Sequence, residues 1–381
     1  MARIVLGSYM VRYPLAGMLS SPLQWLVACD RLGHEVYLVE KSGWASSCFN
    51  PSRNVMTDDC SYGTKVVDAL LSRHGLGGRW CYVAADGRYH GLSRESIEAV
   101  LASADLYLDF GSHGQWNEEA AGCDLRVLID GEPAFTQMKM ERKLAAGEEV
   151  PTYDRYYTVG ANIGTDRASS PTAGRAWNWV VHPVNLDLFQ PAEPAPDGSF
   201  TTVMNWRAHD PIRWAGKVYG QKDVEFAKFL DLPKRSPVPV EVAVSGKDVP
   251  RDALSEHGWG LRDAHAVTKT FGAYRRYMQA SRGEFGVAKN VFVATNSGWF
   301  SDRSAAYLAT GRPVVLQDTG FSQHLPCGEG LFAVKNVEEA ASAIEEATGN
   351  YMHHSKRARE IAAEHLEAQR VVGRFLGELG L

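Results

Sequence analysis

The amino-acid sequence predicts an α/β protein made of two Rossmann-like, doubly wound domains that face each other across a cleft. Two observations lead to this prediction. Short apolar strands alternate with amphipathic helices along most of the chain, and a proline-rich stretch near the middle separates one such series from a second. Alternating strands and helices favour parallel sheets with right-handed crossovers. The 381 residues also suffice for two domains of ordinary size.

The first series begins with an apolar run at 2–7, followed by a loop, a helix that we expect to begin at Pro22, and a strand at 34–40. This order is that of a βαβ unit. Ser93 is predicted to cap a later helix with its hydroxyl. Further strands are predicted at 106–111, 125–131 and 155–160. We assign residues 1–189 to this first domain.

A linker is predicted at 190–200, because this stretch holds three prolines and few apolar residues. The second series follows it and defines a domain over 201–366, with an amphipathic segment at 367–381. Strands are predicted at 201–206, 238–246, 290–295, 312–318 and 331–334, and helices at 271–281, 304–310, 337–348 and 351–367. In open parallel sheets, ligands bind beyond the carboxyl ends of the strands, so a cleft between the domains is the expected site.

Composition and charge argue against several classes of protein. Apolar residues make up 45% and charged residues 22%, and the net charge is −5 with no long basic run, which disfavours a nucleic-acid partner while leaving room for a local basic cleft. The six cysteines lack zinc-ligand spacing and are typical of buried thiols in a reducing compartment. No stretch of about 18 apolar residues predicts a membrane span. We therefore expect a cytoplasmic protein; the sequence does not determine its oligomeric state.

A polar segment, Ser301, Asp302, Arg303 and Ser304, marks the start of a predicted helix and is a candidate anion site. No GxGxxG follows the first strand and no GxxxxGK[ST] occurs, which disfavours a dinucleotide dehydrogenase or a P-loop NTPase. A helix N-terminus attracts anions through its unpaired N–H groups and its dipole. Ordinary capping by Ser301 or Asp302 is the alternative. Arg303 favours the anion, because a guanidinium in the first turn opposes the dipole unless a negative charge lies nearby.

Three further cations lie near strand ends of the second domain: Arg207, Lys247 and Lys289. Since the carboxyl ends of parallel strands share one edge of a sheet, we expect these side chains and Arg303 to converge on one diphosphate. Each of them taken singly is better explained as an ordinary surface charge, and it is their coincidence at the strand ends that favours a diphosphate site.

The segment ATGRPVVLQDTG at 309–320 resembles the GT-B class of nucleotide-sugar glycosyltransferases, and the SDRS…LATG form is similar to its spore-maturation CgeB-like branch. This resemblance implies a hexosyltransferase whose substrate is a nucleoside diphosphate sugar, with no separate cofactor. It implies that Asp318 and Thr319 face the donor sugar, that the diphosphate lies at 301–304, and that the terminal helix packs back on the first domain. The paired glutamates of many retaining members are replaced here by Gly298 and Ala306, leaving Glu284 as a substitute candidate for the ribose contact.

The catalytic base is expected in the first domain, where this class binds acceptors. His113 follows the strand at 106–111, and imidazole titrates in the range that general-base catalysis needs. Asp130 ends the strand at 125–131, although an Asp-Gly pair is also typical of a turn. No Asp-x-Asp lies on a loop, so no metal ligands are predicted and transfer to a small-molecule acceptor is expected to be metal-independent. A nucleotide-sugar 2-epimerase and a non-catalytic binding protein are the alternatives.

Overall fold

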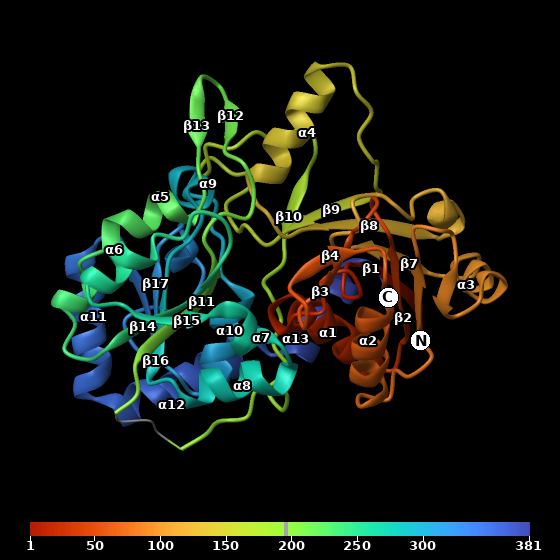
Figure 1. The fold of residues 1–381 in the computed structure, drawn as a ribbon. Coiled ribbons are helices and arrows are strands. Elements are labelled where there is room, and N and C mark those ends of the chain that lie inside the picture. The colour runs from red at the N-terminus through yellow and green to blue at the C-terminus, as the bar shows by residue number, and fades with distance from the viewer. Residues whose placement is uncertain (194–196) are drawn as a thin grey trace.

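The computed structural model describes residues 1–193 and 197–381, and it contains two predominantly parallel sheets that lie side by side (Figure 1). The first sheet has eight strands in the order β10-β9-β8-β7-β1-β2-β5-β6, and the second has six in the order β15-β14-β11-β16-β17-β18. Neighbouring strands are parallel in both sheets, apart from the antiparallel pair β5–β6. The predicted fold of two Rossmann-like α/β domains is confirmed.

The first domain covers its sheet with helices on both faces. Its strands are β1 (Arg3–Gly7), β2 (Glu35–Lys41), β5 (Trp80–Val83), β6 (Tyr89–Gly91), β7 (Leu106–Asp109), β8 (Leu125–Asp130), β9 (Arg155–Thr158) and β10 (Trp177–Trp179). Its helices are α1 (Ala16–Arg31), α2 (Ser61–Ser72), α3 (Arg94–Leu101), η1 (Glu119–Gly122) and α4 (Phe135–Ala145), and β3 (Cys48–Asn50) pairs with β4 (Val55–Thr57) in a hairpin. The middle of β1 is buried because parallel sheets are covered on both faces.

Two predictions about helix starts in this domain have different outcomes. Ser93 does cap α3, since its hydroxyl accepts a hydrogen bond from the backbone N–H of Ser96. The prediction that Pro22 begins a helix is wrong, because α1 begins at Ala16 and contains Pro22. The apolar face of the helix extends one turn earlier than Pro22, where Leu19 is 2% exposed, and this burial favours the earlier start.

The second domain carries the remaining elements. Its strands are β11 (Phe200–Asn205), β14 (Val240–Ser245), β15 (Gly260–Asp263), β16 (Gly283–Gly286), β17 (Val314–Gln317) and β18 (Leu331–Val334), with a hairpin of β12 (Ile212–Trp214) and β13 (Lys217–Tyr219). Its helices are α5 (Lys222–Phe226), η2 (Ala227–Phe229), η3 (Leu232–Lys234), α6 (Arg251–Glu256), α7 (Ala264–Thr268), α8 (Phe271–Ala280), α9 (Asn290–Ala294), α10 (Asp302–Ala309), η4 (Phe321–Gln323), α11 (Val337–Gly349) and α12 (Tyr351–Ile361). The π-helical η5 (Ala362–Leu366) leads into α13 (Ala368–Glu378). Figure 1 shows α4 and the β12–β13 hairpin projecting on the same side of the molecule.

The strand predicted at 290–295 is wrong: this segment forms α9, and the strand lies earlier, as β16. Glycine is depleted in strands, so the sequence Gly-Glu-Phe-Gly does not predict one. The position demands glycine nevertheless, since a Cβ on Gly283 would lie 2.4 Å from Cε1 of Phe200 and 2.7 Å from the carbonyl oxygen of Pro313. The apolar residues Val291 and Phe292 pack in a separate cluster with Trp299.

The C-terminal helix α13 packs against α1 of the first domain. The rings of Phe375 and Trp25 lie 5.1 Å apart, and the hydroxyl of Tyr157 donates to Glu378 at 3.1 Å. A single hydrophobic cluster contains Leu6 of β1, Leu308 of α10 and Phe375 of α13, so it continues across both domains. The predicted domain boundaries remain predictions, and residues 194–196 of the predicted linker lie outside the described residues.

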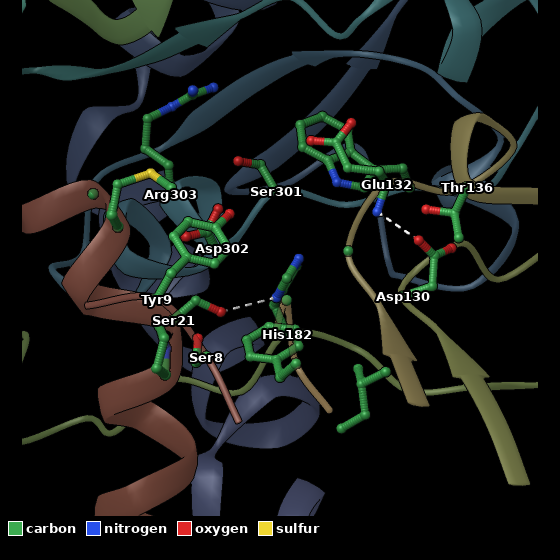
Figure 2. Close-up of a pocket in the computed structure, with 18 of the residues that line it drawn as sticks. Ser8, Tyr9, Ser21, Asp130, Glu132, Thr136, His182, Ser301, Asp302 and Arg303 are labelled. Carbon is green, nitrogen blue, oxygen red and sulfur yellow. Dashed lines mark hydrogen bonds between the residues drawn. The ribbon is translucent and has the colours of Figure 1, made fainter. Parts of the chain in front are cut away.

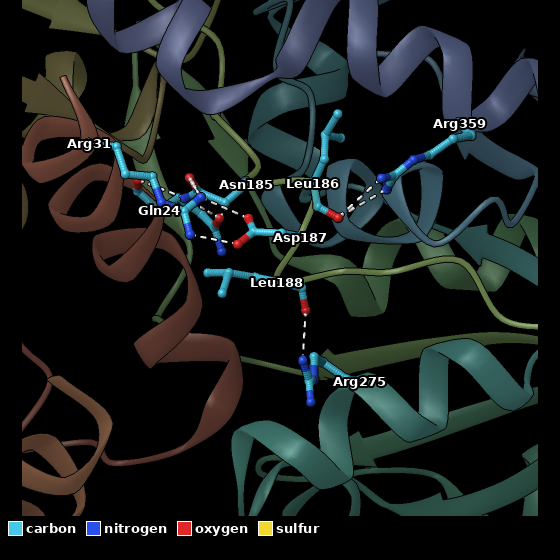
Figure 3. A network of polar contacts seen from close by, with 8 residues as sticks. All are labelled: Gln24, Arg31, Asn185, Leu186, Asp187, Leu188, Arg275 and Arg359. Carbon is cyan, nitrogen blue, oxygen red and sulfur yellow. Dashed lines mark hydrogen bonds and ion pairs between the residues drawn. The ribbon is translucent and has the colours of Figure 1, made fainter. Parts of the chain in front are cut away.

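The chain passes from the first domain to the second near residues 185–188, and side chains of both domains contact this segment (Figure 3). From the first domain, Gln24 accepts a hydrogen bond from the backbone N–H of Asn185 at 2.6 Å, and Arg31 pairs with Asp187. From the second domain, Arg359 donates to the carbonyl of Leu186 at 3.2 Å and Arg275 to that of Leu188 at 3.1 Å. These contacts orient the two sheets so that their carboxyl edges face each other. Among the described helices, none is long and apolar enough to cross a membrane.

Candidate functional site

A cavity of about 370 Å³ lies between the carboxyl edges of the two sheets (Figure 2). The first domain lines it with the loops after β1, β7 and β8 and the start of α1, and the second domain with the starts of α5 and α10 and the loop after β16. We call it the central cavity; Tyr9, His113, Glu132, Lys222, Lys289 and Arg303 are among its lining residues. Strand order reverses between β1 and β7 and between β11 and β16, which are the switch points where such sheets bind ligands.

Arg303 reaches the central cavity, but its charge is already balanced. The side chain is 7% exposed, its Nε donates to Glu284, and its Nη1 donates to the carbonyl of Val203 at 2.8 Å. Burial opposes the charged form, and the Glu284 carboxylate outweighs this and raises the pKa of the guanidinium. Nη2 has no hydrogen-bond partner within the described residues. Nη2 is itself buried, so Arg303 does not present the open fork that the sequence predicts.

The neighbours of Arg303 do not cap α10. Ser301 occupies the N-cap position without a side-chain hydrogen bond, and Asp302 lines the cavity in the first turn. Ser304 is fully buried, and its hydroxyl has no partner in the described chain. The alternative prediction, that Ser301 or Asp302 caps this helix with its side chain, is therefore wrong. An anion would meet the positive end of the helix dipole here, but beside the carboxylate of Asp302.

Lys289 lies in the central cavity as part of an ion pair between the domains. Its Nζ lies 2.6 Å and 2.5 Å from the two carboxylate oxygens of Glu132, which follows β8 in the first domain. The Lys289 residue is 9% exposed. The predicted strand-end cation is therefore in the expected place, with a carboxylate that the sequence does not predict as its partner.

Lys222 is the cation that the sequence analysis did not identify. It begins α5 and lines the central cavity, with no hydrogen bond or ion pair to any described residue. Desolvation lowers the pKa of its ammonium well below the usual value, and the nearby charges of Arg303 and Lys289 lower it further. The carboxylates of Glu284 and Asp302 oppose this shift in part. A short five-residue helix after an irregular loop gives no periodic signal, so only the fold brings this lysine to the site.

Arg207 and Lys247 do not line the central cavity. They line a neighbouring cavity of about 1000 Å³, the side cavity, between α4 and the loops after β11 and β14. Arg207 pairs with Asp223 at 2.6 Å and with Asp248 at 3.0 Å. Of the four cations predicted to converge, only Lys289 and Arg303 line the central cavity. Lys222, which was not predicted, lines it as well.

Asp318 and Thr319 line neither cavity; both stabilise the turn after β17. The carboxylate of Asp318 accepts from the backbone N–H of Gly320 and from the hydroxyl of Ser322, each at 2.8 Å. The hydroxyl of Thr319 donates to the carbonyl of Trp299 at 2.5 Å. Their geometry is that of a braced turn and lends no support to a contact with a donor sugar.

His113 lines the central cavity at the end of β7 while still exposed to solvent. It has a positive φ of 56°, and Asp109 braces its loop by accepting from the N–H groups of Ser112 at 2.8 Å and Gly114 at 2.7 Å and from the hydroxyl of Tyr153 at 2.6 Å. Desolvation lowers the pKa of the imidazole, against the opposing effect of the Asp109 charge. A neutral imidazole held in this way can accept a proton.

Asp130 lies in the wall of the cavity, but internal donors occupy its carboxylate. It is 3% exposed and accepts from the backbone N–H of Glu132 at 2.8 Å, the amide of Gln137 at 2.9 Å and the hydroxyl of Thr158 at 2.8 Å. Burial raises the pKa of its carboxyl group. Its contacts fit a residue that shapes the turn between β8 and α4, and His113 is left as the better placed of the two predicted catalytic groups.

The described residues include no group of three or more histidine, cysteine, aspartate or glutamate side chains arranged to hold a metal ion. Five of the cysteines are buried thiols and Cys327 is exposed. What the central cavity offers is a cluster of cations and a helix N-terminus on the second-domain wall, opposite a histidine on the first-domain wall.

Neither a protein-family model nor a curated protein matches the sequence. Solved structures do match. The Anabaena protein HepE, in complex with UDP and glucose, has a TM-score of 0.57 at 10% identity, and an alpha-glucosyltransferase in complex with UDP and a 13-mer DNA has 0.62 at 9%; both matches cover 100% of each chain. A glycosyltransferase from Rickettsia africae has 0.52 at 11%, over 99% of this chain and 97% of its own. These likenesses show that the chain has the GT-B fold.

Proposed function

We propose that the protein is a metal-independent, cytoplasmic glycosyltransferase, of the hexosyltransferase type, that moves a sugar from a nucleoside diphosphate sugar to a small-molecule acceptor. The observation that carries the proposal is the cluster of Lys222, Lys289 and Arg303 in the cavity between the two sheets, in which Lys222 is partly exposed and has no hydrogen bond or ion pair to a described residue. Cations gathered in one cavity repel one another, so the site is suited to an anion that carries more than one negative charge. The similar structures of HepE and the alpha-glucosyltransferase hold UDP.

In this proposal the donor diphosphate lies against the second-domain wall. Ammonium groups and the start of α10 stabilise the negative charge that develops on the leaving diphosphate as the bond to the sugar breaks. The sugar carbon then faces the first domain. An acceptor hydroxyl attacks that carbon, and its proton passes to the imidazole of His113.

The proposed acceptor is a small molecule, although one of the similar structures holds DNA. The net charge of −5 speaks against a long phosphate backbone, which is bound by many lysines and arginines. Transfer to DNA is therefore a result that the experiment below must be able to detect.

A thermal-shift series with UDP, GDP, ADP and their sugar conjugates tests the donor site. We expect one nucleoside diphosphate and its sugar conjugate to raise the melting temperature, because a ligand that binds only the folded state stabilises it. Incubation with that donor alone, with small acceptors and with duplex DNA then identifies the reaction by mass spectrometry. An epimer formed from the donor alone would identify a 2-epimerase instead, and no stabilisation by any of these ligands would refute the donor site.

A further inference from the structure

The ion pair between Lys289 and Glu132 joins the two domains inside the central cavity. Both carboxylate oxygens of Glu132 lie within 2.6 Å of the Lys289 ammonium. The Glu132 side chain is 37% exposed, whereas that of Lys289 is 11% exposed. In the free protein, the Glu132 carboxylate is thus paired with Lys289, one of the cations of the proposed diphosphate site.

The ion pair between Arg303 and Glu284 differs from that between Lys289 and Glu132 in the exposure of its carboxylate. Glu284 is fully buried on β16, so it has no solvent-facing route away from Arg303. Glu132 follows a β-strand of the opposite domain, and the hydrogen bond from its N–H to Asp130 holds its main chain in place. Its side chain can therefore leave Lys289 by rotation alone, without any movement of the turn.

The balance of charge in the cavity favours replacing the Glu132 carboxylate on Lys289 by a diphosphate. Lys222, Arg303 and Lys289 lie close enough for their charges to act on one another, and Glu132 and Glu284 are the carboxylates paired with two of them. A nucleoside diphosphate carries more negative charge than one carboxylate, and it would reach Lys222 as well as Lys289. It is therefore the stronger partner for this cluster.

We propose that Glu132 is an internal competitor of the donor diphosphate, which holds Lys289 in the free protein and is displaced when the donor binds. The inference rests on the proposed function, since it names how the donor site is occupied before the donor arrives. It assigns to a first-domain residue a direct effect on donor affinity.

The test is titration calorimetry with UDP on the full chain and its variants. Glu132→Gln keeps the size of the side chain and removes its charge, and we expect UDP to bind about fivefold more tightly, the scale of one partly exposed ion pair. Glu132→Asp keeps the charge but shortens the reach, and we expect it to tighten binding too. Glu119→Gln is the matched control, because Glu119 pairs with Lys41 on the same domain outside the central cavity.

A double-mutant cycle separates competition from a general charge effect. In a Lys289→Met background, Glu132→Gln should change UDP affinity by less than about twofold, because the pair no longer exists. Lys289→Gln serves as a second background if the methionine variant melts at a lower temperature. Equal or weaker UDP binding by Glu132→Gln, or a tightening that persists without Lys289, would overturn the inference. Failure of the unaltered protein to bind any of UDP, GDP and ADP would instead overturn the proposed function on which it rests, and binding of GDP or ADP in place of UDP would move the same titrations to that nucleotide.

Discussion

Replacement of Lys222 by methionine should have two opposite effects, a loss of donor affinity and a gain in the stability of the free protein. Methionine has nearly the length of lysine but no charge. A hydrogen bond between a charged group and the diphosphate contributes about 1.5–3 kcal/mol, so UDP should bind about 10- to 100-fold more weakly. The free protein should unfold at a higher urea concentration, because the variant no longer places a partly desolvated ammonium beside the charges of Arg303 and Lys289.

The stability gain should depend on pH with a definite sign. The pKa of Lys222 in the folded protein lies well below that of an unfolded lysine, which is about 10.4. Between these two pKa values the unfolded chain binds more protons, so the stability of the unaltered protein rises with pH there. The advantage of Lys222→Met should be largest below the folded pKa and should shrink as pH rises toward about 10.4.

Calorimetry with UDP and urea denaturation across pH measure the two effects. Lys234→Met is the matched control, since Lys234 is an exposed lysine paired with Asp231 and lies away from both cavities. The control should change neither UDP affinity nor the dependence of stability on pH between about pH 7 and 10.4, because the Asp231 carboxylate that Lys234 contacts titrates in the acidic range. Unchanged UDP affinity in Lys222→Met would refute its role in binding the diphosphate. A stability gain that does not vary with pH would refute the assignment of that gain to a desolvated ammonium.

Three further substitutions test other parts of the structure. Arg303→Ala should lower the free energy of unfolding by about 3–5 kcal/mol, because it leaves the buried carboxylate of Glu284 unpaired, and a loss below about 1 kcal/mol in urea denaturation would contradict this. His113→Ala should lower turnover by about 10²–10⁴-fold while calorimetry finds UDP affinity unchanged, and full turnover would remove it as the base. Phe375→Ala should cost about 3–5 kcal/mol by removing the contact of α13 with Trp25, and an unchanged denaturation midpoint would show that this contact contributes little.

The order of strands and helices could be predicted from the sequence because most elements carry their own pattern of apolar residues. β16 could not be predicted, since two of its four residues are glycines that close packing against neighbouring elements requires, and glycine has low strand propensity. A Cβ on Gly286 would lie 2.9 Å from Leu316 and 3.0 Å from Nη2 of Arg303, so the strand keeps glycine where it passes β17 and α10. The apolar residues of α9 then took its place in the prediction.

The candidate site was predictable only as far as strand ends converge. That rule correctly brought His113, Lys289 and Arg303 to one cavity, because all three lie near carboxyl edges of the two sheets. It failed for Asp318, which follows β17 closely but turns its carboxylate onto Gly320 and Ser322. Position at a strand end determines which edge a residue occupies, while the local turn determines where its side chain points.

The sequence does not show which cations are paired with carboxylates, and for this reason it pointed to Arg303 rather than to Lys222. Arg303 lies in a conspicuous polar segment, yet Glu284, 19 residues earlier, balances its charge. Lys289 is balanced by Glu132, 157 residues away and in the other domain. A cation without a carboxylate partner can bind a ligand directly, whereas a paired cation must first be released, and this difference depends on contacts between distant parts of the chain. Lys222 has no hydrogen bond or ion pair to a described residue, which makes this lysine a stronger marker of the anion site than the polar segment at 301–304.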